Sequence, residues 1–391
     1  MKVWARVKFL GFLPLMAALL AGCVETTVAP GPTGAQAQKT QTVMRPATRP
    51  SAQIAANQPR RVALLLPLSG PQAAVGDSLM KASMLAVQEL APGTLEIMVE
   101  DTGRGAAKAF NAAQASGAQA VIGPLFSADV QGIRADAAAS GVPVLALSND
   151  TSLAGQNIYV MGFWPGAQIS RVLTYAQKRG LRNIAVLLPD DAYGRAVEAA
   201  VNSSLQPPSR LISLVRYPAS GDVSLAAGQL AQARGQYDAL LVPAGGTQLF
   251  NLLGALNQQN LLQAGNGRPV QLLGSGLWDE SELQGRPELV GAWYAAPDPT
   301  ARLNFNSRYQ RAYGEQPVRI ASLAYDATAL TAVLASRNWP YSAQALTQGQ
   351  GFDGIDGLFR LQTGGLVDRG LAILQFTPSG LQTIDVAQRR F

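Results

Sequence analysis

Short aliphatic runs alternate with helical patterns from residue 61 to residue 150. The apolar runs lie in segments 62–68, 95–99, 119–127 and 142–150, and the helical patterns lie at 76–90, 104–116 and 129–140. Runs of Val, Ile and Leu without polar alternation are typical of strands that are covered on both faces. Their alternation with helices of roughly ten to fifteen residues predicts crossover units on a parallel sheet.

The same alternation begins again after residue 157 and continues to residue 273. It predicts a second doubly wound sheet, because a chain of 391 residues exceeds one ordinary core. Helical patterns at 301–313 and 320–336 are expected to complete the first lobe. The predicted fold class is α/β, with two doubly wound αβα lobes. We expect residues 60–157 and 296–338 in lobe 1, and residues 158–295 and 339–391, which end in hairpin patterns, in lobe 2.

In parallel sheets, the loops at the carboxyl ends of the strands line the ligand crevice. In the first lobe these loops hold Ser69, Ser127, Ser148 and Asn149, which suit a site built from hydroxyls and backbone amides. Structural roles compete with this interpretation. Ser127 also suits the cap of the following helix, and Ser148 and Asn149 also suit a turn. Trp278, in a loop of the second lobe, lies either in the crevice or in the core, where aromatic residues are more often found.

The amino terminus has the pattern of a bacterial lipoprotein signal. Three basic residues precede an apolar stretch at 9–20 that is too short to span a bilayer comfortably. The segment ends in Leu-Ala-Gly-Cys23, which resembles the lipoprotein processing motif. This resemblance implies that residues 1–22 are removed and that Cys23 carries acyl chains. Val24, in place of an aspartate, implies the outer membrane, with the protein facing the periplasm.

Residues 23–59 are expected to join this anchor to the folded region as a flexible tether. The segment is rich in Ala, Gln, Thr and Pro, lacks aromatic residues and has no apolar period. As a coil it would span about 30–35 Å. A tether of that reach would let an anchored domain search for a partner.

The charge and the rare residue types exclude several function classes. The formal charge is +6, but most of the excess lies before residue 50, which leaves about +1 for the globular part. That balance gives no electrostatic footprint for nucleic acid. The absence of histidine excludes Ser-His-Asp and Cys-His catalysis and histidine-ligated metals. With one cysteine there is no disulfide, and we expect neither a metal nor a cofactor.

Several motifs together resemble the type I periplasmic-binding-protein family. They are residues 62–69, 121–124, 191–194 and 325–328, and the hairpin at 354–361, which follow one another in the family's order. The resemblance covers residues 60–391. It implies two αβα lobes joined by three crossovers, with a ligand cleft between them.

Within that fold, the lipoprotein signal together with residues 64–70 and 123–125 resembles one subgroup in particular. These are outer-membrane lipoproteins that activate bifunctional penicillin-binding proteins during peptidoglycan synthesis. The resemblance implies a non-catalytic regulator whose partner is a peptidoglycan synthase. The alternative is a solute-binding receptor of an ABC importer for amino acids or another small polar ligand.

The residues expected in the cleft can be compared with what an amino-acid ligand requires. A zwitterion needs hydroxyls and amides for its carboxylate and an acid for its ammonium group. Ser127 matches the family's hydroxyl and Tyr193 matches its cleft tyrosine. The acid expected just after strand 270–273 is missing, because Asp279 comes some positions late, and Val75 replaces an expected aromatic residue. An amino-acid ligand is therefore disfavoured.

An enzymatic interpretation depends on a single motif. Ser78 and Lys81 match the S-x-x-K pattern of penicillin-recognising serine enzymes, but the chain has no K-T-G. A serine and a lysine one helical turn apart are also common by chance. We therefore expect a protein without catalytic activity.

Overall fold

The computed structural model describes residues 58–391, except residues 219–221 and 264–266. The predicted signal peptide, the lipid attachment at Cys23 and the tether lie outside the described residues. Among the described residues, no helix has the length and apolarity needed to cross a membrane.

The strands form a five-stranded, a seven-stranded and a three-stranded sheet. They are β1 (Arg60–Leu66), β2 (Leu95–Asp101), β3 (Ala120–Ile122), β4 (Val144–Ala146), β5 (Ile158–Val160), β6 (Asn183–Pro189), β7 (Arg210–Tyr217), β8 (Ala239–Leu241), β9 (Gln271–Gly274), β10 (Trp293–Ala296), β11 (Phe352–Gly354), β12 (Gly357–Leu361), β13 (Val367–Arg369), β14 (Ala372–Thr377) and β15 (Gly380–Asp385).

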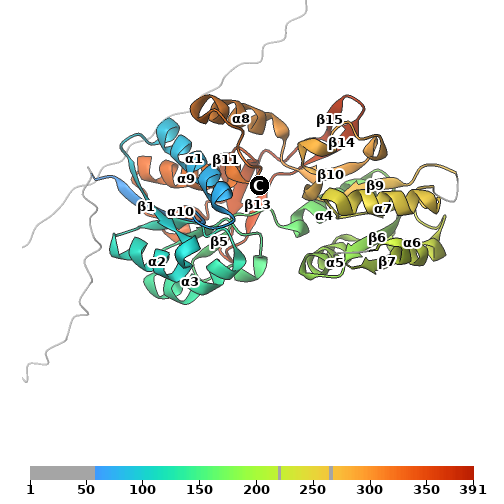
Figure 1. The fold of residues 1–391 in the computed structure, drawn as a ribbon, viewed down its shortest axis with the longest axis horizontal. Coiled ribbons are helices and arrows are strands. Elements are labelled where there is room, and N and C mark those ends of the chain that lie inside the picture. The colour runs from blue at the N-terminus through green and yellow to red at the C-terminus, as the bar shows by residue number, and fades with distance from the viewer. Residues whose placement is uncertain (1–57, 219–221, 264–266) are drawn as a thin grey trace, which may run out of the picture. The chain divides into compact units, whose positions relative to one another are not determined.

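The helices cover the two larger sheets, as Figure 1 shows. They are α1 (Ala73–Leu90), α2 (Ala106–Ala115), α3 (Ser127–Ser140), α4 (Pro165–Lys178), α5 (Ala192–Ser204), α6 (Ser224–Leu230), α7 (Gly246–Gln258), α8 (Pro299–Tyr313), α9 (Ala321–Ser336) and α10 (Ala343–Leu346).

The two larger sheets are separate, as the sequence predicts. The first has the order β2-β1-β3-β4-β5 and is parallel throughout. The second has the order β15-β14-β10-β9-β8-β6-β7, and only β14 and β15 run antiparallel to their neighbours. The chain passes between the lobes three times: after β5, after β10 and after β13. The α/β fold with two doubly wound sheets is therefore confirmed.

Each central strand contributes side chains to two cores, which explains the unbroken aliphatic runs. In β1, Leu64 points into one core of the first lobe, whereas Leu65 points into the other. In β6, Leu187 and Leu188 divide in the same way between the two cores of the second lobe. All four are fully buried. A leucine buried in this way stabilises the fold by about 1.5–3 kcal/mol relative to an exposed one.

Helices far along the chain pack against the first helix. Phe305 and Tyr309 of α8 and Tyr325 of α9 share one hydrophobic cluster with Ala82 of α1. The two helices therefore cover the first sheet, where the sequence analysis expects them.

The lobe boundaries differ from the predicted ones at two places. Strand β5 pairs with β4 in the first sheet, although we expect lobe 1 to end at residue 157. Residues 339–369 are expected in lobe 2, but Phe359 and Val367 pack into a core of the first lobe together with Leu64. An amphipathic hairpin has one apolar face to bury, and its pattern does not say which of two lobes will cover that face.

Candidate functional site

A cavity of about 1140 Å³ lies where loops of the two lobes meet. Ser127 follows β3 and Asn149 follows β4, so the first lobe contributes the carboxyl ends of its strands. Tyr193 follows β6, so the second lobe also contributes a lining residue from the carboxyl end of a strand. From there the cavity continues along α4 and α5 as far as Lys178. Its volume exceeds the roughly 300–1,000 Å³ of typical small-molecule pockets.

Three of the predicted site residues, Ser127, Asn149 and Tyr193, line this cavity. Ser127 and Asn149 are exposed there. The competing cap role of Ser127 is wrong, because α3 begins at Ser127 itself and no side chain caps that helix. Whether these residues hold a ligand stays a prediction.

Tyr193 lines the cavity, and hydrogen bonds fix both the start of its helix and its hydroxyl group. Asp191 caps α5 by accepting the backbone N–H of Gly194 at 2.8 Å, which fixes the start of the helix. The Tyr193 hydroxyl donates to Ser275 Oγ at 2.7 Å. Burial disfavours the phenolate and raises the pKa of Tyr193 to about 12. The side chain is therefore a neutral hydrogen-bonding group whose donor is already used.

The other three predicted site residues do not line the cavity. The backbone N–H of Ser69 donates to Asp101 Oδ1 at 3.2 Å, which stiffens the loop after β1. Ser148 is buried, and its Oγ accepts the N–H of Asp150 at 3.2 Å, as in a side-chain turn.

Trp278 is a core residue, so its assignment to the cleft is wrong. Its side chain is fully buried, and Nε1 donates to Ala244 O at 2.9 Å. The ring packs edge-on against Tyr294. A buried indole with a satisfied N–H is a stable arrangement, and it leaves no face for a ligand.

The carboxylates that line the cavity all have protein partners. Asp150 accepts the backbone N–H and the hydroxyl of Ser152 at 3.0 and 2.6 Å. Asp368 pairs with Arg360 at 2.6 Å, and Asp385 pairs with Arg171 at 2.6 Å. None of these acids was predicted as a site residue. Arg171 and Asp385 lie far apart in the sequence, so no local pattern could have predicted their pairing.

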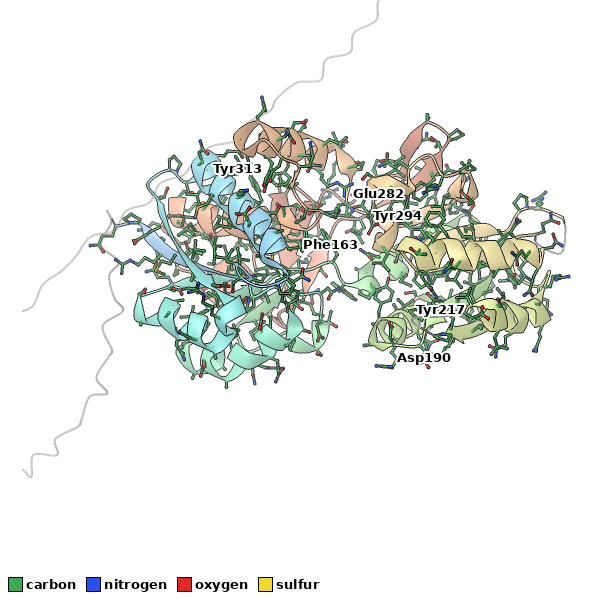
Figure 2. The ribbon with its side chains drawn as sticks, in the orientation of Figure 1. Phe163, Asp190, Tyr217, Glu282, Tyr294 and Tyr313 are labelled. Carbon is green, nitrogen blue, oxygen red and sulfur yellow. The ribbon has the colours of Figure 1, made fainter. Side chains whose placement is uncertain are left out.

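A network of charged groups connects the second lobe to the first. Asp279, which follows β9, accepts Arg302 Nη2 of α8 at 2.8 Å and pairs with Arg319 Nη2 at 2.8 Å. The Asp279 side chain is only 4% exposed. Arg319 also lies 3.2 Å from Asp356 and stacks over the ring of Phe163, 4.7 Å from its centroid. Phe163 is labelled in Figure 2, in the connection that leaves β5.

The network continues to a buried acid on α9. Asp326 lies 3.7 Å from Arg369 and accepts the backbone N–H of Ile355 at 2.6 Å. Burial disfavours its charged form, and repulsion from Asp356 adds to that effect, so the pKa of Asp326 rises to about 7. The charge of Arg369 and the backbone N–H groups of Ile355 and Asp356 oppose this rise. No local pattern predicts this cluster, because Asp326, Asp356 and Arg369 lie in separate segments of the chain.

Ser78 and Lys81 are both engaged in structural contacts. Ser78 Oγ accepts the backbone N–H of Val318 at 3.1 Å and lies 3.2 Å from the Tyr309 hydroxyl. Lys81 pairs with Asp77 at 2.6 Å and with Glu315 at 2.8 Å. These acids raise the pKa of Lys81, which makes it a poor general base. Within the described residues, no group of three or more acidic, cysteine or histidine side chains could hold a metal ion.

Residues 59–380 match the model of the periplasmic binding protein family. The chain therefore belongs to this family, whose members are binding proteins and not enzymes.

Solved structures of similar fold include proteins of ABC transporters and a regulator. A protein of Rhodospirillum rubrum attributed to a branched-chain amino acid ABC transporter has a TM-score of 0.71 at 17% identity, over 83% of this chain and 100% of its own. An ABC transporter substrate-binding protein from Sphaerobacter thermophilus has a TM-score of 0.67 at 18% identity, over 84% and 97%. The C-domain of LpoA from Haemophilus influenzae, a regulator of PBP1A, has a TM-score of 0.64 at 19% identity, over 83% and 99%. These likenesses show the fold.

Among curated sequences, an uncharacterised protein of Rickettsia prowazekii is 23% identical over 146 residues. The match covers 37% of this chain and 39% of that protein. The chain thus spans about two-fifths of that relative.

Proposed function

We propose that the protein is a non-catalytic lipoprotein of the periplasm, anchored in the outer membrane, that binds and activates a peptidoglycan synthase. The predicted acylation at Cys23 would hold it at the membrane. The folded region would supply the surface that contacts the synthase. The fold likeness to the LpoA C-domain supports this proposal.

One observation carries the choice between a regulator and an amino-acid receptor. Asp279 is the carboxylate nearest in sequence to the position where the sequence analysis expects the ammonium-binding acid. It is bound by both Arg302 and Arg319, and it does not line the cavity. A buried acid with two guanidinium partners is not available to a ligand ammonium group, because leaving either arginine unpaired would cost several kcal/mol.

The rest of the cavity supports the same choice. Of the three acids that line it, Asp368 and Asp385 pair with Arg360 and Arg171, whereas Asp150 accepts hydrogen bonds from Ser152 and forms no ion pair with a described residue. A zwitterion would therefore find hydroxyls for its carboxylate, but among the described acids of the cavity only Asp150 for its ammonium group.

The second candidate is a receptor for a small polar ligand that lacks an ammonium group. The size of the cavity and the exposed Ser127 and Asn149 favour it. Such a ligand would stabilise the folded chain in proportion to its saturation, by about 2.7 kcal/mol at one hundred times its Kd.

The test uses the full-length chain in detergent and the bifunctional penicillin-binding protein of the same organism. Binding is measured by biolayer interferometry, and glycan polymerisation and crosslinking are measured with lipid II as substrate. We expect saturable binding and a several-fold faster synthase. The chain alone should show no turnover of lipid II.

A parallel measurement addresses the receptor. The melting temperature of the chain is recorded with a panel of amino acids and of small carboxylates. A chain that leaves the synthase unchanged, and that one of these compounds stabilises by several degrees, would be a solute receptor instead.

A further inference from the structure

Six exposed basic side chains gather where the strands of the second sheet begin. We call this surface the basic edge; it consists of Lys178, Arg179, Arg182, Arg210, Arg234 and Arg268. They lie at the amino ends of β6, β7, β8 and β9: Lys178 ends α4, Arg210 begins β7, and the other four lie in the connections that lead into β6, β8 and β9. Figure 1 labels β6, β7 and β9 together with α6 and α7.

The sheet register brings these connections together. Asn183 of β6 pairs with Arg210 of β7, and the backbone N–H of Arg210 donates to Arg182 O at 2.8 Å. On the other side, β6 pairs with β8, and β8 pairs with β9. Because the strands are parallel, all four connections open on one edge of the sheet.

Five of the six cations on this edge form no ion pair with a described acid. Its connections contain one carboxylate, Asp238, which accepts the backbone N–H groups of Arg182 and Asn183 at 3.1 Å. Within the described part of the chain, no acid lies at ion-pair distance from Lys178, Arg179, Arg182, Arg210 or Arg234. By contrast, arginines elsewhere, such as Arg61, Arg302 and Arg308, pair with carboxylates.

Two of these arginines are nevertheless held in place by neutral oxygens. Arg210 Nε donates to Asn183 Oδ1 at 3.0 Å, and Arg234 Nη2 donates to Gln259 O. Residues 58–391 contain 25 basic and 24 acidic side chains, so six bases beside one acid form a strong local concentration of charge. Ordered cations without counterions attract an anionic surface and raise the rate at which it associates.

We propose that the basic edge is the docking surface for a carboxylate-rich face of the partner protein. This inference rests on the proposed function and names the surface through which the synthase binds. A protein face fits better than a bilayer, because none of the large exposed hydrophobic side chains of the described region lies in these connections. Surfaces that bind membranes usually add apolar residues that enter the lipid.

The experiment measures association of the synthase with full-length chain in detergent at several salt concentrations. In the reversal variant, Arg182→Glu and Arg210→Glu are combined. A second variant combines Lys178→Glu and Arg179→Glu, whose exposed side chains form no ion pair with a described residue; of the two, Lys178 also lines the far end of the cavity. The matched control combines Lys108→Glu and Arg311→Glu, which reverse two exposed charges of the first lobe.

We expect the association rate constant to fall at least about tenfold in both edge variants and to stay within twofold of the parent in the control. The parent should lose affinity as salt rises, and the edge variants should lose most of that dependence. Parent-like melting temperatures confirm that the variants are folded.

Three outcomes would contradict the inference in distinguishable ways. If the edge variants bind the synthase as the parent does, the basic edge is not the docking surface, but the proposed function still stands. If the parent does not bind the synthase at all, both the docking surface and the proposed function are wrong. Edge-dependent binding to phosphatidylglycerol vesicles, but not to phosphatidylcholine vesicles, with unchanged synthase binding, would assign the edge to a membrane.

Discussion

The substitution Asp279→Asn tests whether the charged network between the lobes stabilises the folded protein. Asparagine keeps the shape and one acceptor oxygen, but removes the charge that Arg302 and Arg319 share. Breaking a buried ion pair by removing one partner costs about 3–5 kcal/mol. We expect the lower end, about 3 kcal/mol, because the Arg319 side chain is 27% exposed and keeps Asp356 as a partner.

That free energy converts into a measurable change in melting temperature. An unfolding entropy of about 2.1 cal/mol/K per residue gives roughly 0.7 kcal/mol/K for a folded region of this length. The expected fall in Tm is therefore about 4 °C at pH 7.5, measured by calorimetry or circular dichroism at one scan rate. Small-angle X-ray scattering on the same sample shows whether the lobes also separate.

The matched control is Asp385→Asn, which removes the charge of a more exposed pair. Asp385 is 38% exposed, and its partner Arg171 keeps a hydrogen bond to Leu371 O at 2.9 Å. Exposed pairs contribute about 0–1 kcal/mol, so we expect a fall of at most about 1 °C. If the two variants melt within 1 °C of each other, the reasoning about burial at Asp279 is wrong.

Three further predictions concern buried positions of the first and second lobes. The folded-state pKa of Asp326 is raised to about 7, so between about pH 4 and 7 the folded protein holds a proton that the unfolded chain has released. The stability of the folded protein therefore falls as pH rises through this range. Asp326→Asn should flatten this part of the Tm-against-pH curve, and an unchanged slope would contradict the raised pKa of Asp326. Ser78→Ala leaves the partly buried N–H of Val318 without its acceptor and should cost about 1 kcal/mol in chemical denaturation, whereas labelling of the parent by a fluorescent β-lactam would show that Ser78 is a nucleophile. Gly194→Ala would place a methyl group 1.8 Å from Pro189 O, so we expect a Tm several degrees lower or failure to fold, and a parent-like Tm would show that the turn is not tight.

Local patterns predicted most of the elements, because each buried strand needs a continuous apolar run. The run at 62–68 appears as β1, with Leu64 and Leu65 divided between two cores. Local pattern did not predict the lobe of an element that could pack equally well against either one. The hairpin that contains Phe359 is the clearest case, because its apolar face fits a core of the first lobe.

The sequence predicted those residues of the candidate site that come directly after a strand. Ser127, Asn149 and Tyr193 each follow a strand of a parallel sheet, and all three line the cavity. Trp278 also follows a strand, but its ring turns into the core to bury its large apolar surface. Which way a side chain turns at a strand end depends on the neighbours that it meets.

The sequence by itself determined the two doubly wound sheets and the edge to which their ligand loops belong, since both follow from short-range periodicity. Only the tertiary structure decided the electrostatics, because an ion pair forms between side chains that folding brings within about 4 Å. Asp279, Arg302 and Arg319 meet across the two lobes, whereas Arg182 and Arg210 form no ion pair with an acid of the described residues. Distance along the chain carries no information about either arrangement.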